Sequence, residues 1–552
     1  FPTSGDETIG TPNNFYINYY AGYAHDDWRV GPNLTLNLGL RYEFEQGLQE
    51  RDNLITVGFS RDKAFPVQVT GLNLKGGLLY AGVDGAPTHQ SDPSKKRFTP
   101  RVGFAYKFSD KVVLRGGYGI FTAPNQYAFP NENRLGTRGF TAVTTYVAST
   151  DGGLTPCPGC TLTNPFPNGV EQPSGSSLGL RTGAGGDVHF VDQFRKSAYV
   201  QQYSADLQYE LGDGNVVSAS YVGARNENLS VGGTNSNTVN INQLDRKFLS
   251  EGTKLLEQVP NPMFGNAAFG ALGRQATVPR GQLLRPFPQF LDIFAHQVSE
   301  GYARYDSMVL KFERRIARGW GANINYTLSR SRDNLFGEVN YFSNNSNGLA
   351  RALDNNDLDA EFSPSVIEAP HRLNVSGVYE LPFGKGKKYL DAGGPADWFL
   401  GGWQVAAIGS YQSGFPVVIV QDTNNSGLFG SFQRPNLVAG QDPKTSGSTE
   451  DRLNNWFNPA AWTAAAPFTF GNAPRTDTRV RTPFKKNWDI AFQKNQRLSE
   501  RFTLQLRAEI LNAFNDANFL GPATRFGRAD FGQITQVGGF PRLLQWMARV
   551  QF

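Results

Sequence analysis

Apolar and polar residues alternate with a period of two through much of the sequence. Between Leu34 and Phe44 every even position is apolar, and every odd position is polar or glycine. Residues 320–328 and 502–510 show the same alternation. Because successive side chains of a strand point to opposite faces, the pattern predicts antiparallel strands with one apolar and one polar face.

The alternation predicts 13 strands, and most are longer than the strands of ordinary globular sheets. Their length matches the roughly 9 to 11 residues that a tilted strand needs to cross a bilayer, against about 5 to 6 in globular domains. They are expected near 14–28, 33–44, 100–108, 111–122, 197–211, 214–225, 303–316, 319–332, 371–381, 402–413, 486–496, 501–514 and 542–552.

The connections between these strands alternate between short and long. Short turns are predicted near 30–32, 109–110, 212–213, 317–318 and 498–500, and the 382–401 link is intermediate. Long loops rich in Gly, Asn, Pro and Ser fall at 45–97, 123–196, 226–302, 333–370 and 414–485. Turns at one end and loops at the other are typical of outer-membrane β-barrels, whose turns are periplasmic and whose loops are extracellular.

Composition excludes several other classes of protein. Of 552 residues, 39% are hydrophobic and 13% aromatic, which is too polar for a helical membrane protein and too aromatic for a disordered chain. The net charge of +5 comes from basic residues that form no single patch, which disfavours nucleic acid as a partner. Two cysteines rule out a disulfide scaffold.

The last strand carries a second indication of a barrel. Its alternating residues end on an aromatic, like the C-terminal strand by which outer-membrane proteins are recognised for insertion by the barrel-assembly machinery; an ordinary terminal strand is the alternative. The predicted assembly signal consists of Leu544, Trp546, Ala548, Val550 and Phe552. A periplasmic Phe552 makes strands 1 and 13 run inward. Bacterial single-chain barrels have even strand numbers, whereas the count here is 13, which implies further strands upstream. We therefore interpret residues 1–552 as the C-terminal portion of a barrel.

Several motifs resemble the C-terminal barrel half of TonB-dependent transporters, specifically the Oar-like subgroup. They are DDWRV (26–30), LTLNLGLRYE (34–43), FTPRVGFAY (98–106), LRGGYG (114–119), PHRLNVSGVYELPFG (370–384), GWQV (402–405) and EILNAFN (509–515). The resemblance implies a transmembrane barrel of 22 strands with a plugged lumen. It also implies energised movement of a bulky, unidentified ligand, with contact to the TonB complex through a plug and N-terminal parts that these residues do not include.

Few residues are candidates for site chemistry. Cys157 and Cys160 form a CxxC in a long loop, which indicates a local disulfide in an oxidising compartment, with a redox pair or half a zinc site as alternatives. Polar strand positions predicted to face the lumen and contact the plug are Asn323, Asn325, Thr327, Arg507 and Glu509. No catalytic, cofactor-binding or metal site is expected. The acidic stretch 354–361 could offer oxygen ligands to Ca²⁺ but is better explained as a solvated loop.

The sequence therefore predicts an all-β antiparallel transmembrane barrel in the outer membrane of a Gram-negative cell, with long extracellular loops that capture ligand. A passive porin or adhesion barrel is the first alternative. The second is a soluble secreted all-β protein that binds or hydrolyses carbohydrate.

Overall fold

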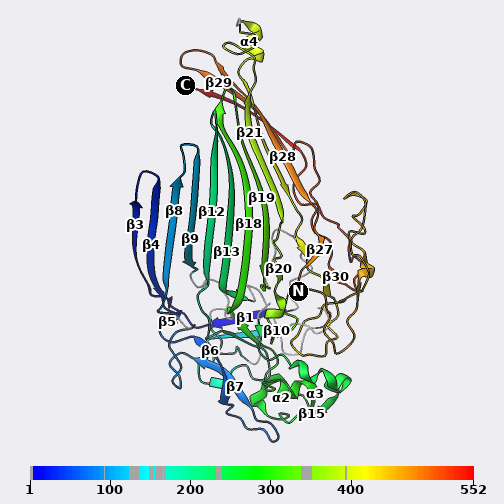
Figure 1. Cartoon of the computed structure of the whole chain (residues 1–552). Coiled ribbons are helices and arrows are strands. Elements are labelled where there is room, and N and C mark those ends of the chain that lie inside the picture. Colours follow the sequence, from blue (N-terminus) through cyan, green and yellow to red (C-terminus); the bar gives the residue numbers. More distant parts are fainter. Residues whose placement is uncertain are drawn as a thin grey trace.

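One long antiparallel sheet dominates the computed structural model (Figure 1), which describes residues 4–91, 94–123, 136–147, 155, 166, 169–231, 239–336, 351–391 and 394–552. Thirteen strands lie side by side in chain order, and the short β20 (Ser363–Pro364) pairs beside β19. The thirteen are β3 (Tyr19–Arg29), β4 (Leu34–Glu45), β8 (Phe98–Lys107), β9 (Val112–Thr122), β12 (Tyr199–Gly212), β13 (Asn215–Val231), β18 (Val298–Ala317), β19 (Trp320–Asp333), β21 (His371–Glu380), β22 (Trp403–Gln412), β28 (Lys485–Arg497), β29 (Thr503–Leu511) and β31 (Leu543–Gln551).

Each of the 13 predicted strands is present, so the all-β fold class is confirmed. The first prediction is too long: β3 begins at Tyr19, and Phe15–Tyr16 form a separate strand, β2, that pairs with β5 (Gln49–Glu50). β13 and β18 exceed the prediction, with 17 and 20 residues, because they continue past irregularities in register at Asn226 and Leu229.

The register gives the sheet one apolar face and one polar face. Leu36 stands opposite Trp28 and Phe104, whereas its neighbour Asn37 stands opposite Asp27 and donates a hydrogen bond to it. Directly opposed residues point to the same side of a sheet. The apolar residues of neighbouring strands therefore gather on one face, and their polar residues gather on the other. On the apolar face Leu207 of β12 is 47% exposed and Leu40 of β4 is 49% exposed.

Tight turns join the strands at one end of the sheet. Between β12 and β13, Asp213 and Gly214 have φ angles of 52° and 75°, and positive φ at both central residues is the conformation that a two-residue hairpin favours. The sheet is open: within the described residues, β3 pairs only with β4 along its length and β31 only with β29.

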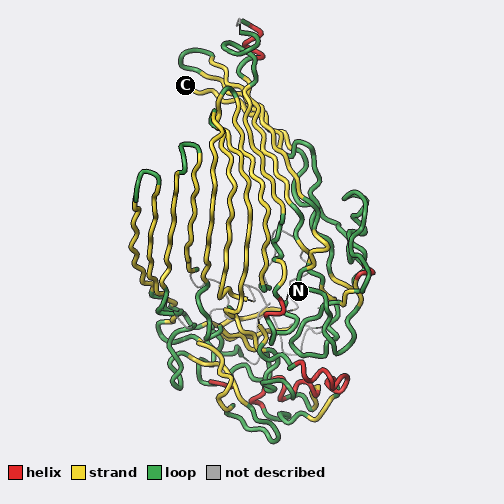
Figure 2. The backbone as a smooth tube through the Cα atoms, viewed as in Figure 1, coloured by secondary structure: helices red, strands yellow, loops and turns green. Residues whose placement is uncertain are grey.

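The long loops pack together at the other end of the sheet into a body that we call the cap (Figures 1 and 2). It contains small sheets of β1 (Ser4–Gly10) with β10 (Thr141–Val147), β6 (Thr56–Ala64) with β7 (Lys75–Tyr80), and β17 (Ile293–His296) between β11 (Val188–Val191) and β14 (Val239–Asn240). Shorter elements are η1 (Gly179–Arg181), η2 (Arg246–Leu256), β15 (Gln258–Pro260), η3 (Ala267–Phe269), α2 (Gly270–Gly273), β16 (Thr277–Pro279), α3 (Arg280–Leu283), η4 (Asp359–Glu361), β23 (Pro416–Val417), β24 (Val420–Gln421), β25 (Asn436–Leu437), η5 (Pro459–Ala461), β26 (Trp462–Thr463), β27 (Asp477–Arg481) and β30 (Arg525–Phe526).

The cap has its own hydrophobic core, to which five separate loops contribute. The fully buried Phe59 ring lies 5.4 Å from the ring of Phe190 and 5.9 Å from that of Phe290, centre to centre. Phe336 and Val418 bring two further loops into the same cluster. A second cluster joins the 414–485 loop to the connection between β29 and β31. The predicted loops are thus a folded layer over one end of the sheet.

The apolar spacing at 244–258 predicts a short amphipathic helix with Ser250 as a possible cap, and the structure confirms a helix there but not its cap. The helix, η2, is of the 3₁₀ type, and Asp245 caps it by accepting a bond from the Lys247 N–H. Gly252, at φ 55°, interrupts it. Among the described residues, no helix has both the length and the apolar composition that crossing a membrane requires.

Candidate functional site: the polar face and the pocket beneath the cap

The polar face of the sheet brings the predicted β19 residues together with charged and amide side chains of the adjacent strands. Asn323 and Asn325 stand opposite Glu313 and Lys311 of β18. Lys311 and Glu313 form an ion pair of 2.6 Å, and the Asn325 side-chain amide donates to that of Asn323 at 2.5 Å. Thr327 is on the same face, opposite Arg372 of β21.

Arg507 and Glu509 occupy the same face at the far side of the sheet. They form an ion pair of 2.5 Å along β29. Arg507 stands between Gln493 and Met547, and Glu509 stands between Ala491 and Gln545. The polar face therefore extends across β28 and β29 to the edge strand.

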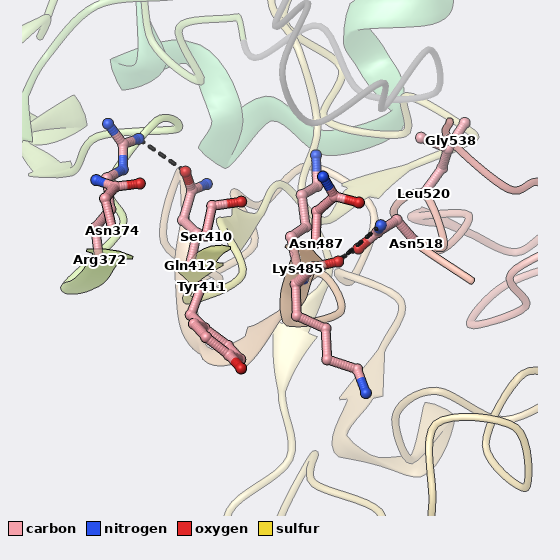
Figure 3. A pocket seen from close by; sticks show the side chains of 11 residues that line it. Arg372, Asn374, Ser410, Tyr411, Gln412, Lys485, Asn487, Asn518, Leu520 and Gly538 are labelled. Atoms are coloured by element: carbon pink, nitrogen blue, oxygen red, sulfur yellow. Dashed lines mark hydrogen bonds between the residues drawn. The ribbon is translucent and has the colours of Figure 1, made fainter. Parts of the chain in front are cut away.

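A pocket of about 320 Å³ lies where this face meets the cap (Figure 3). Strands β21, β22 and β28 supply most of its lining, and the connection between β29 and β31 supplies the rest. The lining residues are Arg372, Asn374, Ser410, Tyr411, Gln412, Lys485, Lys486, Asn487, Asn518, Leu520 and Gly538. Register places Arg372, Gln412 and Lys485 in one row across three strands.

The pocket lining is basic and rich in amides. Arg372 donates to the Gln412 side chain at 2.8 Å (Figure 3), and Lys486 forms an ion pair of 2.8 Å with Asp516. Asn518 accepts from the Lys486 backbone N–H and donates to its carbonyl, at 3.1 and 3.0 Å, which fixes the β29–β31 connection against β28. Since the described lining residues include three cations and no carboxylate, the pocket favours anionic or hydroxyl-rich groups.

Buried ion pairs hold the cap in place above the pocket. Arg475 is enclosed and donates to the Asp333 carboxylate at 2.6 Å and to the carbonyls of Leu335 and Glu361 at 2.7 and 3.0 Å. The buried Glu361 carboxylate pairs with Arg434. The acidic stretch considered for Ca²⁺ therefore supplies internal bonds, and Asp354 likewise accepts from Gln243 at 2.8 Å.

The five residues of the predicted assembly signal occupy the C-terminal edge of the sheet. Leu544, Trp546, Ala548 and Val550 stand opposite Ile510, Ala508, Leu506 and Leu504 of β29, and so share the apolar face. The Phe552 ring is 97% exposed and lies 6.4 Å from the ring of Phe502.

The predicted loop disulfide of Cys157 and Cys160 lies outside the described residues. His371, in the motif at 370–384 and at the start of β21, makes a hydrogen bond of 2.7 Å with the Tyr326 hydroxyl. Sequence reasoning missed the pocket residues of the β29–β31 connection. It also missed a pair formed by His189 Nδ1 and His296 Nε2, 2.9 Å apart, because nothing in their local sequence links positions so far apart in the chain.

Long antiparallel strands, an apolar and a polar face, tight turns at one end and long connections at the other together define an outer-membrane β-barrel type of sheet. Residues 2–545 match the family described as "Outer membrane beta barrel domain". The chain belongs to that family, and the alternative of a soluble secreted protein is therefore wrong.

The chain is also similar to parts of larger solved structures. The ferripyoverdine receptor of the Pseudomonas aeruginosa outer membrane, bound to ferripyoverdine, is 10% identical, with a TM-score of 0.41 over 98% of this chain and 39% of that one. The outer membrane transporter YddB from Escherichia coli is 10% identical, with a TM-score of 0.43 over 97% and 45%. The chain spans less than half the length of these proteins. No curated protein matches it.

Proposed function

We propose that this chain is the barrel portion of a TonB-dependent outer-membrane transporter or receptor, of the Oar-like subgroup, that moves a bulky ligand across the outer membrane. The observation that carries the proposal is the polar face, which runs into a basic pocket directly beneath a folded cap. The family membership and the motifs at 34–43 and 370–384 support it.

In this proposal the cap is extracellular, the turns and Phe552 are periplasmic, and the barrel-assembly machinery inserts the chain through its last strand. The cap captures the ligand, and the row of Arg372, Gln412 and Lys485 receives its anionic or hydroxyl groups. Further along the polar face, Asn323, Asn325, Thr327, Arg507 and Glu509 contact a plug. The plug and the TonB-binding segment belong to parts outside these residues, and an odd number of additional strands closes the sheet.

The decisive experiment separates a plugged, TonB-coupled barrel from a passive porin. The complete protein, reconstituted in a planar lipid bilayer, is expected to show no steady open-channel current, because the plug fills the lumen. It is also expected to be retained on an immobilised periplasmic domain of TonB. Steady current steps without TonB retention would establish the porin instead.

Orientation is tested on intact cells with a membrane-impermeant maleimide. Lys254 lies on the exposed surface of the cap, and Glu500 lies in an exposed turn. The variants Lys254→Cys and Glu500→Cys are each made in a Cys157→Ser/Cys160→Ser background. Labelling of position 254 alone is expected. Labelling of position 500 alone would reverse the proposed topology.

A further inference from the structure

The link between β21 and β22 contacts the apolar face near the turn end of the sheet (Figure 1). Its helix α4 (Pro395–Leu400) covers Lys494, which register places on that face opposite Trp403. The Lys494 ammonium donates to the carbonyls of Trp398 at 2.6 Å and Gly401 at 2.5 Å. The Trp403 indole N–H donates to the Phe399 carbonyl at 2.9 Å. These bonds give the Lys494 ammonium hydrogen-bond partners on a mostly apolar face, and they fix α4 against the strands.

Between this link and the strands lies a groove of about 690 Å³ whose described lining is entirely apolar. Phe383, Leu390 and Leu400 line it from the link, and Phe492, Ile510 and Trp546 line it from β28, β29 and β31. Leu400 is 55% exposed and Trp546 is 78% exposed. Because the groove starts at the turn end of the sheet and continues along the strands, it has the direction of a hydrocarbon chain that enters a bilayer from its surface.

Cationic groups stand beside the groove. Lys385 and Lys388 lie on the loop between Phe383 and Leu390. The nearby carboxylates are occupied within the link: Glu380 pairs with Lys387 at 2.6 Å, Asp391 accepts from the Gly386 N–H at 2.6 Å, and Asp397 accepts from the Lys385 N–H at 2.8 Å. Among the described residues, no carboxylate pairs with the ammonium group of Lys385 or Lys388.

We propose that the groove is a binding site for a glycerophospholipid with an anionic headgroup. One acyl chain lies along the groove, and Lys385 and Lys388 attract the headgroup phosphate. The apolar groove matches the acyl chain of such a molecule, and the two lysines without a carboxylate partner match its phosphate; the Lys388 ammonium lies over the Tyr389 ring, 5.1 Å from its centre. The apolar face of an outer-membrane barrel is the face that lipid can reach. The inference rests on the proposed function only in its choice of membrane leaflet: if the turns are periplasmic, the site lies in the inner leaflet, which consists of phospholipid.

The test measures lipid retention and is independent of transport. The complete protein, delipidated in detergent, is titrated with dioleoyl phosphatidylglycerol or dioleoyl phosphatidylcholine, and bound lipid is counted by native mass spectrometry. We expect one phosphatidylglycerol to bind preferentially. In Lys385→Gln/Lys388→Gln the preference should fall by about fivefold for each lysine, with phosphatidylcholine binding unchanged.

The groove itself is tested by Leu400→Ser, which should weaken the binding of both lipids by about tenfold. Leu207→Ser is the matched control, because Leu207 is a similarly exposed leucine on the apolar face of β12; it should bind as the wild type does. Heat-modifiable migration in gels confirms that each variant is folded. Equal retention of the two lipids by the wild type, equal effects of the two leucine variants, or capture of lipopolysaccharide or a protein instead would each overturn the proposal.

Discussion

At the scale of single residues, Asn242 shows how the cap satisfies its buried backbone without long regular elements. Its fully buried side-chain amide donates to the carbonyls of Phe287, Phe290 and Leu291, at 3.0, 3.1 and 2.7 Å. Its side-chain oxygen accepts from the Phe287 N–H at 2.8 Å. One side chain thus replaces the partners that a strand or helix would provide for the turn at 287–291.

Replacing Asn242 by Ala should therefore destabilise the cap strongly. Each buried group that loses its partner costs roughly 1–3 kcal/mol, and we expect a total of at least about 3 kcal/mol. Asn266→Ala is the control, since Asn266 is exposed and makes a single cap bond to the Ala268 N–H; it should cost about 1 kcal/mol. The measurement is the urea midpoint of cap cleavage in pulse proteolysis, and equal midpoints for the two variants would refute the role of Asn242.

Arg475 ties the 414–485 loop to the end of β19 through its ion pair with Asp333. Arg475→Met leaves a buried carboxylate without its cation, which should lower cap stability by about 3–5 kcal/mol. Arg475→Met/Asp333→Leu should recover part of this loss, because the unpaired charge is gone. Arg318→Met, which removes an exposed pair with Asp213 in a turn, should change stability by less than about 1 kcal/mol. A double variant no more stable than Arg475→Met would contradict the argument.

At the scale of elements, what could be predicted from the sequence depended on the range of the interactions. Strand β4 was predicted almost to its ends because its alternation is visible within 12 residues. The cap core was not predicted, because Phe59, Phe190 and Phe336 come from three different loops, and none of these loops shows a period that identifies its partners. The alternation in the sequence identifies the polar strand positions that line the pocket. Asn518 and Gly538 cannot be identified in this way, because only tertiary folding brings them to the pocket.

The parallel strands β11 and β17 carry His189 and His296, whose contact is seen only in the structure. Burial, with the positive charge of Arg138, lowers the pKa of His189 below its usual value. The unfolded chain therefore binds a proton near pH 6.5, where the folded cap does not. The free energy of unfolding of the cap should fall as the pH drops below about 6.5, down to the lowered pKa of the folded state. The measurement is the cap stability obtained by pulse proteolysis between pH 7.5 and 5. In His189→Gln this part of the pH dependence should be absent, and an unchanged profile would exclude His189 as its source.

At the scale of the whole molecule, the directions of the two edge strands constrain how the sheet can close. β3 runs from the cap to the turn between β3 and β4, and β31 also runs from the cap end to the turn end. The 13 strands in sequence thus leave two edges that point the same way. Joining them directly would create a parallel pair in an otherwise antiparallel sheet, and a second copy inserted in the same orientation would meet the same obstacle.

Leaving both edges unpaired in lipid would expose a row of backbone N–H and C=O groups, each costing several kcal/mol. We therefore predict that additional strands separate β3 from β31 in the membrane. In the complete protein, in a Cys157→Ser/Cys160→Ser background, Tyr23→Cys on β3 and Gln545→Cys on β31 should form no disulfide under oxidising conditions. The control pair Arg507→Cys/Met547→Cys, directly opposed on β29 and β31, should crosslink readily. Because both pairs use the same edge strand, a crosslink between β3 and β31 would mean that the sheet closes on itself and would remove the need for further strands.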